Sequence, residues 1–210
     1  MYKRKPLLIT FEGIEGSGKS YQSSQLLKNL KKKNLSIIFT REPGGSVGAE
    51  NIRKLILTRK KKKFSANTDT LLYLASRSDH VEKTILPSLK KKKIIICDRF
   101  YDSTLAYQVY GNNVSKKMVD SVHDVILKNI KPVITFVLTV EISKAFKRLK
   151  KRKKLNRYDK FSKQFYSKVQ KGFIKLANFN KKRYIIINNS DDTNKVEKEI
   201  LEKTLKILKK

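Results

Sequence analysis

The chain has 210 residues, with 50 Lys and Arg against 18 Asp and Glu and a formal net charge of +32. This length fits one well-buried domain over residues 1–210, the single Cys97 excludes an intramolecular disulfide, and the apolar runs are too short to span a bilayer. The chain passes into a strand-like segment within a few residues of Met1, so we expect no signal peptide and a cytoplasmic location.

Lysine dominates the positive charge, since 40 of the 50 basic residues are lysines. The runs at residues 31–33, 60–63 and 90–93 fall where predicted helices end, and there lysine favours the negative end of the helix dipole while staying hydrated. Aromatic residues, which a stacking surface for single strands requires, are not interleaved with these runs. We therefore predict no specific nucleic-acid partner.

The first predicted strand, residues 7–11, enters a glycine-rich turn that ends in Gly18, Lys19 and Ser20 before a helix-compatible stretch. Strand, turn and helix in this order form the complete P-loop pattern, in which backbone N–H groups and the positive end of a helix dipole surround phosphate oxygens. The lysine then reaches the β- and γ-phosphates, and the serine hydroxyl binds Mg²⁺. The predicted nucleoside triphosphate site comprises Gly13, Ile14, Glu15, Gly16, Ser17, Gly18, Lys19 and Ser20.

The second predicted strand, residues 35–40, is followed by Arg41, Glu42, Pro43 and two glycines. Parallel strands bring their carboxyl ends to the ligand edge of a sheet, so an Arg-Glu pair here could contact a second substrate. The alternative is a charged turn that Pro and Gly terminate.

A helical stretch farther along places Tyr73 and Arg77 four residues apart, so that both side chains project from one face. Such a pair suits a ring stacked on a base and a guanidinium at the base edge. The alternative is a core tyrosine beside a solvated charge.

The third predicted strand, residues 94–98, ends in Asp98 and Arg99. In a P-loop protein, an acid after an apolar strand is the usual place for a carboxylate that holds Mg²⁺ or its waters, although the same residue could cap the next helix. The neighbouring guanidinium could grip a phosphate with two hydrogen bonds. Hydroxyl and amide groups follow at residues 103–108.

Two further strands are predicted at residues 133–140 and 184–188, and a final helix at residues 196–208 has apolar residues at helical spacing. Most strands are continuously apolar rather than alternating, as expected when both faces of a sheet are covered. Strands that alternate with helices predict an α/β fold with a five-stranded parallel sheet and helices on both faces.

A basic segment between the last two strands, residues 147–159, contains Arg148, Arg152 and Arg157 among lysines. A basic run is usually a solvated face, but in a phosphotransferase an arginine from a mobile segment can cover the charge on the transferred phosphoryl group. Arginine suits this role better than lysine because its planar fork donates two aligned hydrogen bonds.

Four segments together resemble the thymidylate kinase family of P-loop nucleoside monophosphate kinases: residues 11–20, 40–45, 98–100 and 106–108. The resemblance covers nearly the whole chain, and the Arg-Glu-Pro-Gly-Gly segment is its most specific part. It implies a P-loop kinase fold with a short basic lid at about residues 147–160. It also implies an enzyme that phosphorylates dTMP to dTDP with ATP and Mg²⁺, in dTTP biosynthesis, as a homodimer.

The resemblance further implies a role for each matched position. Lys19, Arg99 and the lid arginines would neutralise charge during transfer, with Arg152 first, Arg148 next and Arg157 in support, and Ser20 and Asp98 would place the metal. The dTMP site would comprise Glu15 at the sugar 3′-hydroxyl, Arg41, Arg53 and Arg99 at the phosphate, Tyr73 stacked on thymine, Arg77, Thr104 and Gln108 at the base edge, and Tyr107 at the sugar.

The lid departs from the family pattern, with Lys153 where the family commonly has glycine and Asn156 where it has aspartate. Three other interpretations stay open at this level. A deoxynucleoside kinase would phosphorylate thymidine itself, a P-loop ATPase acting on nucleic acid would hydrolyse ATP without transfer to a nucleotide, and a binding protein would keep the pocket without turnover.

Overall fold

The computed structural model describes residues 6–57, 64–151, 157–191 and 193–209. Its five strands are β1 (Leu7–Glu12), β2 (Ile37–Arg41), β3 (Ile94–Asp98), β4 (Ile134–Thr139) and β5 (Tyr184–Asn188). They form one sheet in the order β2-β3-β1-β4-β5, and every neighbouring pair is parallel. The predicted five-stranded parallel sheet is confirmed.

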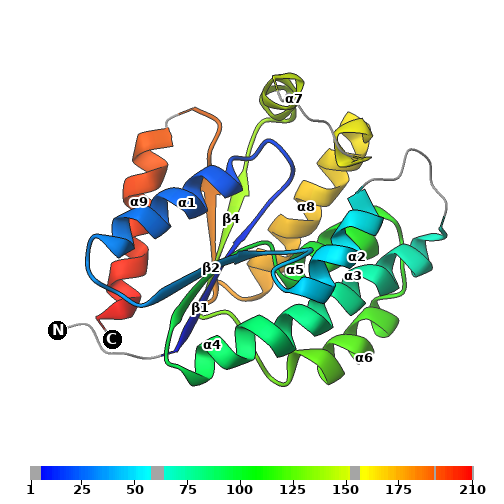
Figure 1. The fold of residues 1–210 in the computed structure, drawn as a ribbon. Helices are drawn as coiled ribbons and strands as arrows, with labels where there is room; N and C mark the ends of the chain where they lie inside the picture. Colours follow the sequence, from blue (N-terminus) through cyan, green and yellow to red (C-terminus); the bar gives the residue numbers. More distant parts are fainter. Residues whose placement is uncertain (1–5, 58–63, 152–156, 192, 210) are drawn as a thin grey trace.

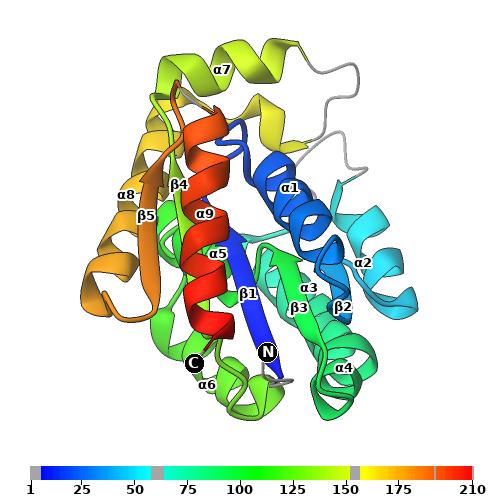
Figure 2. The ribbon, with the colours of Figure 1, turned by 90° about the vertical axis from the view of Figure 1, so that its left-hand side faces the viewer.

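Helices cover both faces of this sheet, as Figures 1 and 2 show from two directions. On one face lie α1 (Lys19–Lys31) and α9 (Thr193–Leu208), which pack against each other. The opposite face carries α3 (Ala66–His80), α4 (Leu86–Lys90), α5 (Tyr101–Thr104), α6 (Lys116–Leu127) and α8 (Lys163–Phe179), and α2 (Val47–Leu57) packs on α3. The remaining elements are α7 (Ile142–Lys150), the π-helices η1 (Val81–Ile85) and η2 (Leu105–Gly111), and the 3₁₀ turn η3 (Arg157–Lys160).

The side chains of β1 explain why its sequence is continuously apolar. Ile9 and Phe11 point to the core under α1 and α9, while Leu8 points to a second core that includes Ile85 and Ile95. Successive strand residues face opposite sides of a sheet, so burial of both faces requires an apolar residue at every position.

The parallel register brings the carboxyl ends of three strands to one edge. Asp98 at the end of β3 pairs with Phe11 of β1 on one side and with Arg41 of β2 on the other. The turn after β1, the Arg41 turn after β2 and the Asp98-Arg99 corner after β3 therefore meet, although they lie far apart in the sequence.

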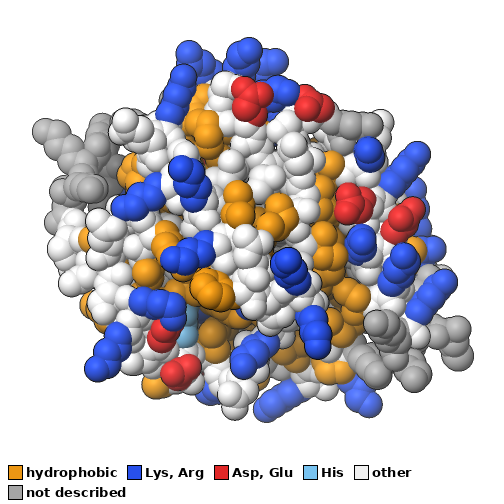
Figure 3. Space-filling model, turned by 180° about the vertical axis from the view of Figure 1, so that it is seen from behind, with side chains coloured by type: hydrophobic (Ala, Val, Ile, Leu, Met, Phe, Trp, Pro, Cys, Tyr) orange, Lys and Arg blue, Asp and Glu red, His pale blue; other side chains and the backbone are white. Residues whose placement is uncertain are grey.

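On the face that Figure 3 shows, lysine and arginine side chains are scattered rather than gathered in one stripe. Two of the lysine runs start at or just after helix ends, since α1 ends at Lys31 and α4 at Lys90. The run at residues 60–63 lies outside the described residues. Within the described ranges, the structure contains no helix with the length and apolarity that a membrane crossing requires.

Candidate active site

The turn between β1 and α1 adopts a conformation that glycine permits. Gly18, the residue before the first turn of α1, has φ 89° and ψ 10°, in the left-handed region where a side chain is strained. The N–H of Ser17 donates to the carbonyl of Ile14 at 3.2 Å, which closes the turn. The predicted P-loop residues thus form one tight loop at the N-terminus of α1.

Lys19 folds back over this loop. Its Nζ donates to the carbonyl oxygen of Ile14 at 2.8 Å, and the side chain is almost entirely buried. Burial first, and the nearby charge of Arg99 second, lower the pKa of Lys19 to about 8. An ammonium group held at this depth gains most from an anionic ligand that restores its counter-charge.

Ser20 and Asp98 meet across the loop. The Ser20 hydroxyl donates to Oδ2 of Asp98 at 2.5 Å, and the Asp98 Oδ1 atom is buried without a hydrogen-bond partner in the described part of the chain. A hydroxyl and a carboxylate with an unsatisfied oxygen are the hard donors that Mg²⁺ prefers. Mg²⁺ usually takes one or two protein ligands besides phosphates and water, a number that this pair would supply.

A polar cavity opens beside the P-loop. Its lining combines residues from the ends of β1, β2 and β3 with residues of α2 and the lid: Glu15, Lys19, Ser20, Arg41, Glu42, Pro43, Arg53, Leu57, Asp98, Arg99 and Tyr158. Arg41 pairs with Glu50 at 3.0 Å, and Arg53 donates to the Pro43 carbonyl at 2.5 Å. Four cationic side chains, those of Lys19, Arg41, Arg53 and Arg99, therefore border one space.

Arg99 lies at the centre of a buried hydrogen-bond network. Its guanidinium donates to Glu15 at 2.7 Å, to the Gly13 carbonyl at 2.9 Å and to the Ser103 hydroxyl at 3.1 Å. The Tyr107 hydroxyl donates to the other oxygen of Glu15. Burial opposes ionisation of Glu15, but the charges of Arg99 and Lys19 outweigh it, so the Glu15 pKa is lowered. Glu15 is therefore a carboxylate at neutral pH.

A second, more apolar cavity of about 420 Å³ adjoins the first. Its lining is Glu15, Glu42, Pro43, Tyr73, Arg77, Arg99, Ser103, Thr104, Tyr107, Gln108 and Tyr158. Five of these residues also line the polar cavity: Glu15, Glu42, Pro43, Arg99 and Tyr158. The two cavities thus form one elongated site with a cationic end and an aromatic end.

The π-helix η2 brings two consecutive residues to this second cavity, directly after Thr104. Thr104 ends α5, and Tyr107 and Gln108 follow in η2. A π-helix is wider than an α-helix, and such segments often occur at functional sites. Here consecutive residues Tyr107 and Gln108 both line the cavity and both are buried.

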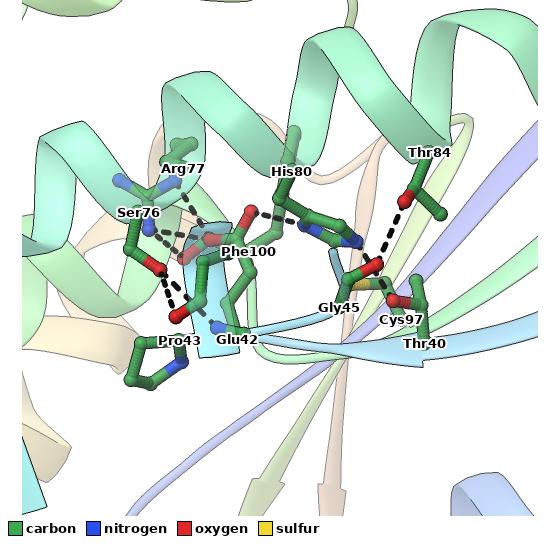
Figure 4. A network of polar contacts seen from close by, with 12 residues as sticks. Thr40, Glu42, Pro43, Gly45, Ser76, Arg77, His80, Thr84, Cys97 and Phe100 are labelled. Atoms are coloured by element: carbon green, nitrogen blue, oxygen red, sulfur yellow. Dashed lines mark hydrogen bonds and ion pairs between the residues drawn. The ribbon is translucent and has the colours of Figure 1, made fainter. Parts of the chain in front are cut away.

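Arg77 belongs to a polar network that Figure 4 shows from close by. Its Nε donates to Glu42 at 2.7 Å, Nη1 donates to Thr104 at 2.7 Å and Nη2 donates to the Phe100 carbonyl at 3.1 Å. The side chain is only 3 % exposed, so the alternative of a solvated charge is wrong. Its Nη1 also lies 2.8 Å from Nε2 of His123, and burial together with the Arg77 charge lowers the pKa of that imidazole to about 3. A neutral His123 can accept this hydrogen bond.

Glu42 connects Arg77 to a histidine that the sequence analysis did not single out. His80 Nδ1 lies 3.0 Å from Glu42, and His80 Nε2 lies 2.7 Å from the Thr40 hydroxyl. Burial opposes ionisation of Glu42, yet Arg77 and His80 outweigh it and lower the Glu42 pKa. Helical spacing is the signal that could have identified His80 from the sequence, because His80 follows Arg77 by three residues and shares its face of α3.

Glu12 and Asp102 form a second group that sequence reasoning missed. Glu12 accepts from the Phe100 N–H at 2.7 Å and from the Ser103 hydroxyl at 2.6 Å, while Asp102 accepts from Tyr184 at 2.6 Å and pairs with Arg183. Burial first and the Asp102 charge second raise the pKa of Glu12 to about 8. Ser103 also accepts from the Arg99 guanidinium. Glu12 therefore helps to hold Arg99 in position through Ser103.

We expect ionisation of Glu12 to destabilise the protein as the pH rises. The pKa of Glu12 is higher in the folded chain than its ordinary value of 4.5, so its stabilising effect is present below about pH 4.5 and lost as the pH approaches 8. The free energy of unfolding, measured by urea denaturation, should fall by about 2–4 kcal/mol between pH 5 and 8.5 for this reason. Glu12→Gln should flatten this slope, whereas Glu202→Gln at an exposed position of α9 should keep it; equal slopes in the two variants would contradict the expectation.

The lid arginines differ in their surroundings. Arg148 donates to the Gly16 carbonyl at 3.1 Å, and Arg157 pairs with Asp69 in the first turn of α3, with 3.2 Å between Nη1 and Oδ1. Tyr158 lines both cavities and contacts Tyr107 edge to face at 5.8 Å between ring centroids. Arg152 lies outside the described residues, as do Lys153 and Asn156.

Comparison with known proteins identifies the family. The sequence model of the thymidylate kinase family matches residues 11–200. The chain belongs to the thymidylate kinase family. The thymidylate kinase of Mycoplasma capricolum is 40% identical over 97% of this chain and 96% of its own length, and that of Acholeplasma laidlawii is 36% identical over 96% of this chain and 100% of its own.

A solved structure of this family also has the same fold. The crystal structure of thymidylate kinase from Ehrlichia chaffeensis matches 96% of this chain and 99% of its own with a TM-score of 0.78 and 34% sequence identity. The predicted P-loop kinase fold is therefore confirmed, together with the resemblance to thymidylate kinases on which it was based.

Proposed function

We propose that this protein transfers the γ-phosphoryl group of ATP to dTMP and releases dTDP and ADP. The bond between the γ-phosphorus and the β–γ bridging oxygen breaks, and a new bond forms between that phosphorus and a phosphate oxygen of dTMP. The observation that carries the proposal is the joined pair of cavities, in which the P-loop, Lys19 and Arg99 border the cationic end and Tyr73 lines the aromatic end.

The P-loop end is proposed to bind ATP. The residues are Gly13 through Ser20, with Lys19 neutralising the β- and γ-phosphates. Support comes from the turn conformation at Gly18 and from the buried Lys19 ammonium, whose lowered pKa a phosphate would raise again. Ser20 and Asp98 would hold Mg²⁺, which neutralises charge on the transferred phosphoryl group when bound.

We propose that dTMP binds across both cavities, with its phosphate in the polar cavity and its base in the apolar one. Arg41, Arg53 and Arg99 would hold its phosphate, since all three border the polar cavity. Tyr73 would stack on thymine, with Arg77, Thr104 and Gln108 around the base and Glu15 and Tyr107 near the sugar; all six line the apolar cavity. Arg77 already donates to Glu42, Thr104 and Phe100, so we propose that it also keeps Thr104 in place for the base.

Catalysis would rest on positioning and electrostatics, because phosphoryl transfer requires little covalent participation by the protein. The Glu15–Arg99 pair is held by Gly13, Ser103 and Tyr107, which fixes the guanidinium before substrate arrives. A preorganised cation needs no reorganisation during the reaction.

The test is transfer of radiolabel from γ-labelled ATP to a series of acceptors with and without Mg²⁺. We expect labelled dTDP from dTMP and no labelled dTMP from thymidine. Labelling of thymidine would favour a deoxynucleoside kinase, and release of phosphate stimulated by DNA or RNA without a labelled nucleotide would favour the ATPase. ATP binding without any transfer would favour a protein that only binds.

Arg99→Lys is expected to lower kcat/KM for dTMP by about 10²-fold while the Kd of ATP changes little. Lysine keeps the charge but lacks the planar fork that reaches Glu15, Gly13 and Ser103 together. Steady-state kinetics with dTMP varied and calorimetric titration with ATP measure the two quantities. A variant that loses ATP affinity and dTMP efficiency equally would contradict the assignment to the acceptor phosphate.

We also propose a homodimer that uses α2, α3 and α6. Large apolar side chains are exposed on these neighbouring helices: Val47 and Leu55 on α2, Leu71 on α3 and Val125 on α6. Burial of such residues is the main driving force for association. Light scattering should give twice the chain mass, and Val125→Lys should give the monomer mass.

A further inference from the structure

Two P-loop carbonyls are held by side chains from other parts of the fold. Nδ2 of Asn189, directly after β5, donates to the Ser17 carbonyl at 2.7 Å. Arg148 in the last turn of α7 donates to the Gly16 carbonyl at 3.1 Å. No motif in the sequence had pointed to Asn189.

Burial and several hydrogen bonds hold Asn189 in place. It is 3 % exposed, its N–H donates to the Thr139 carbonyl at 2.8 Å, and its own carbonyl accepts from Arg148 at 2.9 Å. Arg148 donates further to the Ser190 carbonyl at 3.0 Å. The ends of β4, β5 and α7 thus fix the side chain that touches the P-loop.

The hydrogen bond to Ser17 has a directional consequence. In a planar trans peptide the carbonyl and the following N–H point in opposite directions. Asn189 holds the Ser17 carbonyl, so the Gly18 N–H points to the other side of the loop. No group in the described ranges accepts a hydrogen bond from this N–H, which leaves it available for a ligand. A Cβ at residue 18 would collide with Nδ2 of Asn189, so Gly18 permits the contact.

The arrangement leaves one buried atom unsatisfied. Oδ1 of Asn189 has no hydrogen-bond partner within the described part of the chain. A buried polar atom without a partner is destabilising. Within the described residues, the Asn189 side chain therefore makes its one hydrogen bond through Nδ2, to the P-loop.

We infer that Asn189 is a positioning residue for the phosphate donor. It holds the peptide between Ser17 and Gly18 so that the Gly18 N–H faces the phosphates of ATP. Arg148 in turn holds the backbone carbonyls of Asn189 and Gly16. The inference rests on the proposed function only in that it takes ATP as the donor.

Asn189→Ala and Asn189→Asp test it. Alanine removes the donor, and aspartate is close in shape but places a carboxylate against the Ser17 carbonyl and near the phosphates. We expect the KM and the calorimetric Kd of ATP to rise about 5- to 20-fold for alanine and more for aspartate. The KM of dTMP should stay within about twofold in both variants.

Asn188→Ala is the matched control. Asn188 lies in the same segment and accepts from the Ser190 N–H at 3.0 Å, but its side chain makes no hydrogen bond to the P-loop. This variant should bind ATP like the wild type. Thermal unfolding of Asn189→Ala should remain within about 3 °C of the wild type, because the loss at Ser17 is offset by removal of the unpaired Oδ1.

Unchanged ATP affinity in both Asn189 variants would overturn the inference, and so would a parallel loss for ATP and dTMP accompanied by a lower Tm. Direct ATP titration needs no acceptor, so this outcome is distinguishable from a failure of the proposed function. If the proposed function failed instead, the wild type would bind ATP but would not transfer label to dTMP.

Discussion

Lys19→Met is expected to lower kcat for the transfer from ATP to dTMP by about 10³-fold or more. The ammonium group sits on the P-loop turn, 2.8 Å from the Ile14 carbonyl, and borders the same cavity as Arg99. Methionine fills a similar volume without charge, so the loss reports charge neutralisation rather than shape. Single-turnover transfer of label, with both nucleotides saturating, measures the effect.

The thermal stability of Lys19→Met should not fall with its kcat. The lowered pKa of Lys19 means that its charged form is less stable in the folded chain than in the unfolded chain, and at pH 7 this penalty is present. Lys19→Met should therefore unfold at the same or a higher temperature than the wild type. Lys28→Met, at an exposed position of α1, is the matched control and should keep full activity. Turnover near the wild-type rate in Lys19→Met would contradict the assignment.

Arg152→Ala is expected to lower kcat by about 10³-fold while the KM of dTMP changes little, as for a group that acts mainly in the transition state. The P-loop itself carries no arginine, so we propose that a lid arginine covers the transferred charge. Arg148 binds carbonyls of the P-loop and of the β5–α9 segment, Arg157 pairs with Asp69, and Arg152 lies outside the described residues.

Parallel variants separate the candidates. Arg157→Ala should raise the KM of dTMP more than it lowers kcat, because the Arg157–Asp69 pair joins the lid to α3, the helix that carries Tyr73. Arg148→Ala should raise the KM of ATP together with Asn189→Ala. If Arg152→Ala keeps the wild-type kcat and Arg148→Ala or Arg157→Ala loses it, the role belongs to that residue instead.

The sequence predicted the sheet to within about two residues at most strand ends, and the reason is local. Residues 94–98 and 184–188 were predicted with the bounds that β3 and β5 have, because short β-branched runs bounded by lysine or asparagine carry both the strand signal and its limits. The P-loop was equally predictable, since its residues are contiguous. The lid at about residues 147–160 remains a prediction, and its residues 152–156 lie outside the described part of the chain.

Arg77 illustrates what sequence reasoning left open. From spacing alone it was either a base-reading group or a solvated charge, and only the fold brings Glu42, Thr104 and Phe100 around it. The distance along the chain between Arg77 and these partners gives no local pattern. The same holds for Glu12 with Phe100 and for Asp102 with Arg183.

By itself, the sequence determined the phosphate-binding loop, the parallel α/β architecture and the family, since each depends on contiguous residues or on regular spacing. Tertiary structure decided which buried charges are paired, which residues share the two joined cavities, and that Asn189 holds the P-loop. The physical reason is that burial and hydrogen-bond partners depend on side chains from distant segments, which the strand register brings together only after the sheet has formed.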